Sequence, residues 1–293
     1  MDQGIEIKEW EYEQLLPSFR DLVINNIDDV ISFIDDIRQS YQNNAAVEEF
    51  IVKLETDLKI IDLKSVKGPS LRKRIARELI GSNVIDSKKS ILVVGESGTS
   101  KTYLAHRIAK NSRYKNLMLV NSANPKQDLE KALAAATEEP TSFLLDEVYA
   151  MPLEMQEYCL AEFGRDGIQM RIISTSSTPV EELQRKLKRD FFYRINDWIF
   201  RLRPLSESRP DVEEAIRGLV EEKHRMGIDL RVVEHLRDQH SWPDNFRGVE
   251  RVMETLCRMC KARNIDVISV EILVQLRPEI DEDIQEILKP LIE

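Results

Sequence analysis

Lys101 and Thr102 close the stretch GESGTSKT at residues 95–102, and their setting is typical of a loop that binds phosphate. The run Ser90–Val94 precedes this stretch as a short buried strand, and a helical pattern follows it. In such a loop, backbone N–H groups at the helix start bind phosphate oxygens, the lysine adds positive charge and the hydroxyl can bind Mg²⁺. The candidate phosphate-binding residues are Gly95, Glu96, Ser97, Gly98, Thr99, Ser100, Lys101 and Thr102.

Ser100 departs from the usual motif, which has glycine immediately before the lysine. If this position takes a positive φ, its side chain costs about 1–2 kcal/mol, which weakens phosphate binding without abolishing it. An ordinary strand–helix turn with an incidental lysine is the alternative interpretation.

Two acids, Asp146 and Glu147, follow a second buried apolar run at residues 142–145. Ligands collect at the carboxyl ends of strands in open α/β sheets. Nucleotide hydrolysis needs a metal ligand and a carboxylate that orients water, for which Asp146 and Glu147 are the respective candidates. Adjacent acids can also form a solvated turn; their combination with a phosphate loop favours the nucleotide site.

The elements that must position these residues alternate along the chain. Further strands are predicted at 117–120, 169–174 and 198–202, and helices at 127–137, 151–163 and 179–188. From Pro210 onward the periodicity is helical almost to the end. This order predicts a parallel α/β sheet domain followed by a smaller helical domain.

Residues 1–65 are predicted to be helical, with one apolar stripe from Leu15 to Ile37 and a second from Val47 to Ile61. This segment carries 15 Asp and Glu residues against 6 Lys and Arg. A regulatory or partner-binding pair of helices and a hairpin packed on the next domain both fit this pattern. A break at residues 67–70 precedes a basic helix expected at 71–79.

The composition and charge of the chain limit the classes of protein to which it can belong. The chain has 293 residues and a net charge of −10, which argues against a general nucleic-acid binder. Its apolar runs are too short to span a bilayer, and its first residues lack the features of a signal peptide. Cys159, Cys257 and Cys260 suggest packed, reduced thiols rather than disulfides, so we expect a cytoplasmic protein without a membrane partner.

Seven segments, spread over residues 71–275, resemble the ATPase domain of the bacterial enhancer-binding proteins, the AAA+ activators of sigma-54 RNA polymerase. They are GESGTSKT (95–102), VNSA (120–123), SFLLDEV (142–148), MRIISTSS (170–177), RDFFYRIND (189–197), RPLSESRPDV (203–212) and SWPDNFRGVE (241–250). The resemblance implies an AAA+ P-loop parallel sheet with a small helical lid, and ATP and Mg²⁺ as cofactors.

The resemblance also implies roles for residues near the acidic pair. Asn121 falls at the family's switch asparagine, which restrains the catalytic Glu147 until the γ-phosphate is sensed. Ser176 and Ser177 fall where the family has the Thr-Asn of its first sensor, so this sensor is altered.

Three basic residues match positions of the family that act on the nucleotide. Arg194 matches a finger arginine that reaches the neighbouring subunit's nucleotide, and Lys188 stands at the other finger position. Arg247 matches the second-sensor arginine of the lid. A finger from a neighbour implies a homo-oligomeric ring, usually a hexamer. Surface arginines without such a role are the alternative.

Two departures from the family bear on function. The GAFTGA loop that contacts the sigma factor has no counterpart between Asn121 and Asp146, and no glycine lies between Gly98 and Gly164. The loop before the first sensor is also short, at residues 164–167, and few residues follow Val270 for a helix-turn-helix domain.

We therefore expect an ATPase that remodels or switches an unidentified protein partner, without contacting sigma-54. A nucleotide-dependent scaffold with little turnover, and a transcription regulator acting through another partner, are the alternatives. The expected parts are an acidic helical segment at 1–66, an AAA+ α/β subdomain at 71–205, a lid at 206–280 and a terminal helix at 281–293.

Overall fold

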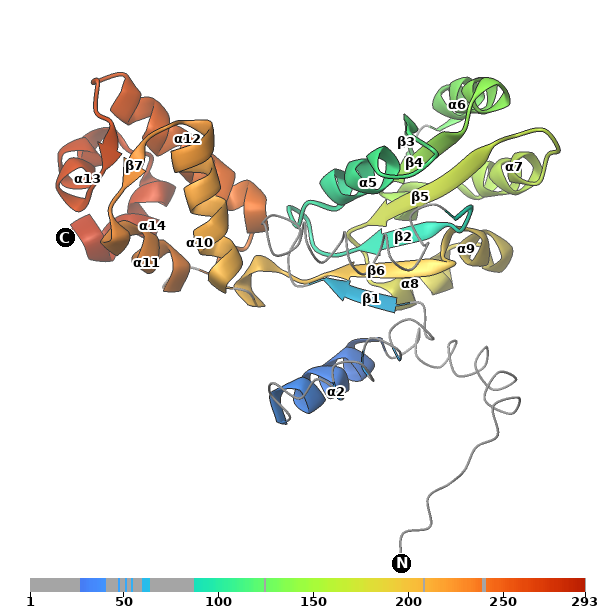
Figure 1. Ribbon diagram of the computed structural model, residues 1–293, viewed down its shortest axis with the longest axis horizontal. Coiled ribbons are helices and arrows are strands. Elements are labelled where there is room, and N and C mark those ends of the chain that lie inside the picture. Colours follow the sequence, from blue (N-terminus) through green and yellow to red (C-terminus); the bar gives the residue numbers. More distant parts are fainter. Residues whose placement is uncertain are drawn as a thin grey trace, which may run out of the picture. The chain divides into compact units, whose positions relative to one another are not determined.

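The computed structural model describes residues 27–40, 60–63 and 87–292, except residues 124, 208 and 239–240, together with Val47, Ile51 and Leu54. The chain divides into two compact units (Figure 1). The sheet unit comprises residues 1–62, 88–94 and 108–201, and the helical unit comprises residues 63–87, 95–107 and 202–293. Each unit has a hydrophobic core of its own.

The sheet unit alternates strands and helices in the predicted order. Its elements are α2 (Ile27–Ser40), β1 (Ile60–Leu63), β2 (Ile91–Val94), β3 (Asn116–Asn121), α6 (Lys126–Glu138), β4 (Thr141–Asp146), η2 (Val148–Ala150), α7 (Leu153–Phe163), β5 (Met170–Ser176), α8 (Val180–Lys186), α9 (Arg189–Ile195) and β6 (Trp198–Leu202). Helix α5 (Lys101–Lys110) begins among the residues of the helical unit and ends among those of the sheet unit.

The strands form one sheet in the order β1-β6-β2-β5-β4-β3. The pairs β6–β2, β2–β5, β5–β4 and β4–β3 are parallel, so the carboxyl ends of these five strands lie at one edge. Val94 pairs with Ser176, and Asn121 pairs with Asp146. The register therefore brings three of the predicted site segments to the same edge of the sheet.

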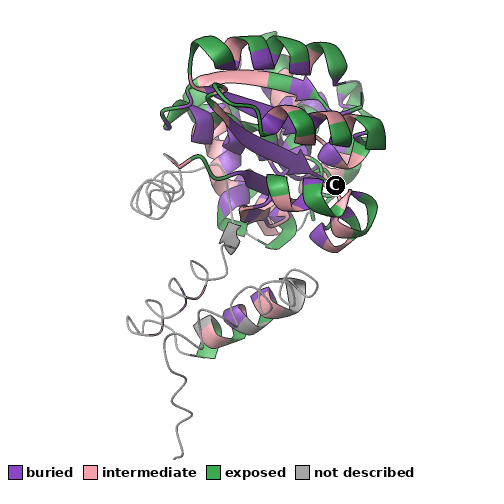
Figure 2. Ribbon diagram, turned by 90° about the vertical axis from the view of Figure 1, so that its right-hand side faces the viewer, coloured by how far each residue is buried: buried purple, intermediate pink, exposed green. Residues whose placement is uncertain are grey.

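The apolar runs form strands because both of their faces are covered. Strands β2 and β4 are buried at nearly every position, whereas β3 is mostly half-buried or exposed. Figure 2 shows the buried strands inside the unit, with exposed residues on the outer surfaces of the helices. Alternate residues Leu92, Val94, Phe143 and Leu145 share one core cluster with apolar residues of α6, α7, α8 and α9. Ile31 of α2 belongs to the same cluster.

Strand β1 corrects the helical prediction for the end of the N-terminal segment. The stripe ending at Ile61 predicts helix, but Ile60–Leu63 is a strand hydrogen-bonded beside β6. A short branched run satisfies either periodicity, and pairing with the edge of the sheet decides the outcome. The break at 67–70 and the helix expected at 71–79 lie outside the described residues.

The helical unit contains one bundle of helices and a two-stranded parallel sheet. Its elements are η3 (Leu205–Glu207), α10 (Arg209–Arg217), the π-helical segment η4 (Gly218–Lys223), β7 (Gly227–Ile228), α11 (Leu230–Asp238), α12 (Asn245–Lys261), β8 (Val267–Ile268), α13 (Val270–Leu276), η5 (Arg277–Glu279) and α14 (Glu282–Ile292). Helix α14 confirms the predicted terminal helix. Its buried residues Ile284, Leu288 and Ile292 belong to the core of this unit.

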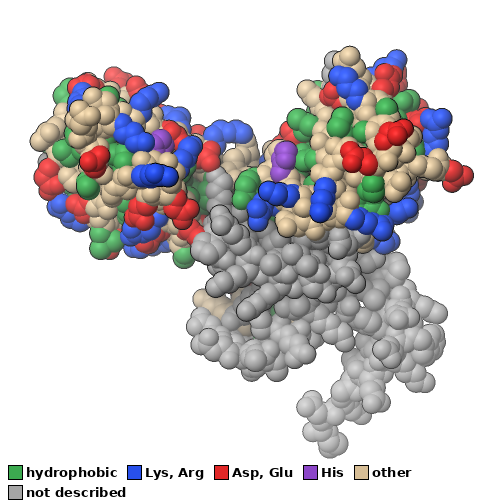
Figure 3. All heavy atoms as spheres, turned by 45° about the horizontal axis from the view of Figure 1, so that its top comes forward, with side chains coloured by type: hydrophobic (Ala, Val, Ile, Leu, Met, Phe, Trp, Pro, Cys, Tyr) green, Lys and Arg blue, Asp and Glu red, His purple; other side chains and the backbone are tan. Residues whose placement is uncertain are grey.

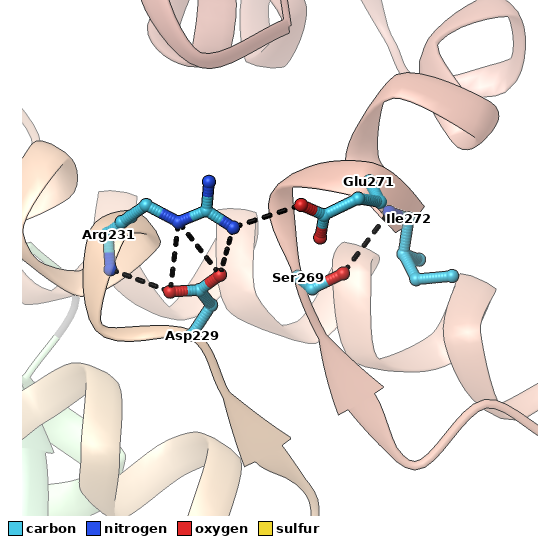
Figure 4. A network of polar contacts seen from close by, with 5 residues as sticks. All are labelled: Asp229, Arg231, Ser269, Glu271 and Ile272. Atoms are coloured by element: carbon cyan, nitrogen blue, oxygen red, sulfur yellow. Dashed lines mark hydrogen bonds and ion pairs between the residues drawn. The ribbon is translucent and has the colours of Figure 1, made fainter.

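A polar network joins the starts of α11 and α13 in the helical unit (Figure 4). The Arg231 guanidinium donates to Asp229 at 2.8 Å and to Glu271 at 3.0 Å. Ser269 caps α13 by accepting the N–H of Ile272. The hydrogen bonds from Arg231 lower the pKa of the Asp229 carboxyl group, and the backbone N–H of Glu271, followed by Arg231, lowers the pKa of the Glu271 carboxyl group. Charged side chains of both signs intermingle over the face of each unit in Figure 3.

Every helix in the described ranges is too short or too polar to cross a lipid bilayer. All three cysteines are buried and free, as predicted, and Cys257 and Cys260 lie within α12.

Candidate functional site

The phosphate loop runs from Gly95 to Ser100, between the end of β2 and the start of α5. Gly98 and Ser100 both have positive φ, at 79° and 73°. The Thr99 hydroxyl donates to the Glu96 carbonyl oxygen at 2.8 Å and closes the turn. Ser100 therefore adopts the conformation that the sequence analysis associates with a cost for its side chain.

Lys101 folds back over this loop. Its Nζ donates to the carbonyl oxygens of Gly95 and Glu96, at 2.9 Å and 3.0 Å, and the residue is only 7 % exposed. The ammonium group is thus fixed above the loop at the start of α5, whose first turn contains no acidic residue. Backbone N–H groups, a fixed ammonium and the adjacent Thr102 hydroxyl form a donor set that suits a polyphosphate anion.

The loop contacts the start of helix α12 within the helical unit. The N–H of Phe246 donates to the Gly98 carbonyl oxygen at 3.1 Å. A Cβ on Gly98 would lie 2.1 Å from the Asp244 carbonyl oxygen, so no other residue fits there. Arg247 donates to the Ser97 hydroxyl at 3.1 Å. These contacts hold the loop against the start of α12 within the helical unit, to which residues 95–107 belong.

Asn245 makes further contacts with this loop, and the sequence analysis did not single it out. It is 1 % exposed and has a φ of 52°. Its Oδ1 accepts the N–H of Leu205 at 2.6 Å, and its Nδ2 donates to the Glu96 carboxylate and the Ser97 carbonyl oxygen, at 3.1 Å and 3.0 Å. Asparagine tolerates left-handed φ, which is the one signal in the sequence that could have pointed to this position.

The acidic pair lies at the carboxyl end of β4 in the sheet unit. Asp146 ends the strand, and Glu147 leaves it with φ 50° and ψ 58°. The Thr175 hydroxyl donates to Asp146 Oδ1 at 2.7 Å and accepts the N–H of Glu147 at 3.0 Å. Thr175 is fully buried in β5, so one hydroxyl group holds both residues of the pair. The sequence analysis did not identify Thr175.

The Glu147 carboxylate is bound by the altered sensor position. The Ser177 N–H donates to Oε2 at 2.8 Å, and the Ser177 hydroxyl donates to Oε1 at 2.6 Å. The Asn121 side chain accepts the N–H of Ala123 at 3.0 Å, while its backbone pairs with Asp146 in the sheet. The structure thus brings Asn121, Asp146, Glu147 and Ser177 to one edge, where Ser177 donates to both oxygens of the Glu147 carboxylate.

Arg194 lies at the opposite edge of the same sheet. Its guanidinium donates to the Phe163 carbonyl oxygen and lines a pocket of about 560 Å³. Ser90 and Met170, which precede β2 and begin β5, line the same pocket. Lys188 caps α9 and forms an ion pair with Glu157. A strand rises about 3.3 Å per residue, so the length of the sheet separates Arg194 from the acidic pair of its own chain.

The oxygen donors suit Mg²⁺, which takes one or two protein oxygens and completes its octahedron with water and phosphate oxygens. Thr102 and Asp146 offer a hydroxyl and a carboxylate of this kind. Within the described part of the chain, no group of three or more His, Cys, Asp and Glu side chains gathers as a self-sufficient metal site. The Thr102 hydroxyl, in the helical unit, and the Asp146 carboxylate, in the sheet unit, are each of the donor type that Mg²⁺ takes alongside phosphate oxygens.

The strand order, the phosphate loop after β2 and the acidic pair after β4 together define the AAA+ fold. Residues 69–205 match the family of the sigma-54 interaction domain. This part of the chain is therefore related to the sigma-54-dependent transcriptional activators.

Individual relatives agree with this assignment. UacR of Escherichia coli K12, named as a sigma-54-dependent transcriptional regulator, is 31% identical over 225 residues, or 62% of this chain and 38% of that protein. Brucella abortus NtrX in complex with ATP has a TM-score of 0.57 at 22% identity, covering 78% of this chain and 63% of that one.

The Holliday junction branch migration motor RuvB of Thermotoga maritima has a TM-score of 0.55 at 18% identity, with 79% of each chain covered. The two structural likenesses show the shared fold. The chain spans about a third to a half of the length of the curated relatives it matches.

Proposed function

We propose that this chain is a Mg²⁺-dependent AAA+ ATPase that couples ATP hydrolysis to the remodelling or switching of a protein partner. The observation that carries this proposal is the loop at 95–100, with the Lys101 ammonium fixed on its carbonyl oxygens at the start of α5. The carboxyl end of β2, from which the loop starts, lies in the same sheet as the end of β4.

The residues take the following roles in this proposal. Lys101 and the loop N–H groups bind the phosphates, and Arg247 binds them from the lid. Thr102 and Asp146 hold the metal, whose charge, when it is bound with the nucleotide, stabilises the phosphoryl group in transfer. Glu147 orients the attacking water, and Asn121 acts as the switch beside it.

A ring of identical subunits follows from the position of Arg194 in this proposal. Arg194 lies at the amino-end edge of the sheet, whereas Asp146 and Glu147 lie at the carboxyl-end edge. An arginine so placed serves a site on a neighbouring copy rather than on its own chain. A finger arginine contributes about 10³–10⁵ in rate, so turnover depends on assembly.

Sigma-54 is not the partner that we propose. Helix α6 forms most of the segment between β3 and β4, and the sequence of this segment contains no GAFTGA, which supports this proposal. The names of the relatives favour a role in transcription regulation through another partner. The acidic N-terminal residues 1–65 are the part of the chain that we propose contacts it.

The decisive experiment measures ATP turnover per subunit over a series of protein concentrations. Turnover should rise with concentration and fall by at least a hundredfold in Glu147→Gln and in Arg194→Ala. Arg185→Ala, which removes an exposed arginine from α8, is the matched control and should behave as wild type. Glu147→Gln turnover equal to wild type would overturn the ATPase assignment.

A nucleotide-dependent scaffold with little turnover is the second candidate. The contact between Ser177 and the Glu147 carboxylate favours it, because a carboxylate that accepts two hydrogen bonds is less available to water. For a scaffold, we expect ATP binding to drive assembly equally in wild type and in Glu147→Gln, and neither protein to hydrolyse ATP.

Lys101→Ala should abolish nucleotide binding under either function. Lys110→Ala is its control.

A further inference from the structure

We propose that Ser177 restrains Glu147, so that release of the Glu147 carboxylate from Ser177 precedes hydrolysis. This inference rests on the proposed ATPase function and adds a regulatory residue to that same site. Ser177 is here a positioning residue, because it acts through Glu147.

The geometry of the contact is bidentate. The Ser177 N–H and the Ser177 hydroxyl donate to different oxygens of one carboxylate, at 2.8 Å and 2.6 Å. Both donors come from the residue that directly follows β5, so the strand fixes their direction. A general base must offer a carboxylate oxygen to the water that it activates. In this arrangement both oxygens already accept a hydrogen bond from Ser177.

The backbone around Glu147 is fixed, so only its side chain has to move. The Thr175 hydroxyl holds the Glu147 N–H and the Asp146 carboxylate together. Glu147 also has a left-handed φ of 50°, a costly conformation for a residue with a side chain that persists only where its surroundings enforce it. Release from Ser177 is therefore a rotation of the Glu147 side chain about a fixed backbone.

Solvent limits the strength of the restraint. Ser177 is exposed and Glu147 is partly buried, so water can replace the hydroxyl once the contact opens. A hydrogen bond to a charged group in such a setting changes an equilibrium by about three- to tenfold, rather than locking it. The contact thus slows hydrolysis in the absence of a signal and still yields to a bound nucleotide or a partner.

Turnover of three variants tests the restraint. Ser177→Ala removes the hydroxyl donor and should raise kcat by about three- to tenfold with KM for ATP unchanged, because one of the two hydrogen bonds is lost. Ser177→Thr keeps a hydroxyl at the same position and should retain the wild-type kcat. Ser206→Ala, at an exposed serine of η3, is the matched control. A lower kcat in Ser177→Ala would overturn the proposal, since Ser177 would then assist catalysis.

A second measurement needs no nucleotide and so separates this proposal from the ATPase assignment. The Ser177 amide should be protected from hydrogen–deuterium exchange in the nucleotide-free protein, and Glu147→Ala should speed its exchange by about tenfold, because the acceptor is gone. Exchange unchanged in Glu147→Ala would contradict the restraint. Accelerated exchange in a protein without turnover would instead keep the restraint and reject the ATPase.

Discussion

The Nδ2 amide of Asn245 donates to the carbonyl oxygen of Ser97 over 3.0 Å, and through it the start of helix α12 is bonded to the phosphate loop. The same side chain bonds Leu205, at the beginning of the helical unit, and the Glu96 carboxylate. One buried asparagine thus joins the loop, the segment after β6 and the start of α12 within the helical unit. Any movement of α12 must change the positions of Glu96 and Ser97.

Asn245→Ala should lower the free energy of unfolding of the helical unit by about 2–4 kcal/mol, because one buried and two partly buried hydrogen bonds are lost. Denaturant unfolding followed by the fluorescence of the buried Trp242 measures it. Asn264→Ala is the matched control: Asn264 is exposed and has a similar φ of 55°. Equal losses in both variants would show that backbone conformation, and not the hydrogen bonds, determines the effect.

Ser100→Gly should raise the free energy of unfolding by about 0.5–1 kcal/mol. Removing the side chain from a residue with a left-handed backbone conformation stabilises the folded state by about 1–2 kcal/mol. The greater conformational freedom of glycine in the unfolded chain offsets about 0.5–1 kcal/mol of this gain. Urea unfolding of the nucleotide-free protein measures this change. Ser100→Ala keeps a Cβ at φ 73° and should show no gain. A gain of the same size in Ser100→Ala would exclude backbone strain as its cause.

Acid should destabilise the helical unit through Asp229. The hydrogen bonds from Arg231 hold the pKa of this carboxyl group below its ordinary value. Its contribution to stability is therefore complete above about pH 4 and is lost as the pH falls through the lower pKa of the folded state. In Asp229→Asn the urea midpoint should vary less with pH below 4, whereas Asp266→Asn, at an exposed aspartate next to β8, should follow wild type.

The three cysteines should resist alkylation in the folded protein. Burial raises the pKa of the Cys257 thiol to about 11 and that of Cys159 to about 12. At pH 8 the reactive thiolate is scarce and inaccessible, so iodoacetamide should label these residues only after unfolding in urea. Mass spectrometry can count the labelled cysteines. Because the unfolded thiol ionises first, stability should also fall as the pH rises from about 9 towards 11. Labelling of native protein at pH 8 would contradict the burial.

Much of the sheet could be predicted because its strands are buried on both faces. The apolar runs of β2, β4 and β6 agree with their predicted bounds to within a residue or two. Strand β5 extends two residues beyond its predicted end, into Thr175 and Ser176, because pairing with β2 and not hydrophobicity carries the strand through these polar positions. The predicted helix at 179–188 is interrupted at Leu187, where α8 ends before α9.

The contacts that organise the site were harder to predict. Thr175 and Glu147 are hydrogen-bonded although they lie 28 residues apart in the sequence. Asn245 and Glu96 are hydrogen-bonded although they lie 149 residues apart. Both depend on tertiary packing, and neither residue type is distinctive where it occurs. Asp146 and Glu147 could be placed because the end of a buried strand is visible as an abrupt change from apolar to acidic residues. The partner of the Glu147 carboxylate needed the structure.

Strand β1 determines whether the edge of β6 is open to pairing with another chain. An uncovered edge strand offers unpaired N–H and C=O groups on which a second chain can add, which is a common start of aggregation. Residues 60–63 occupy that position beside β6. A chain begun at residue 64 would leave the β6 edge open, with Ile199 and Phe200 next to it. We expect that shortened chain to precipitate or form high-mass species in light scattering at concentrations where the full chain remains clear. In the full chain β1 therefore covers the β6 edge and is itself the edge strand of the sheet.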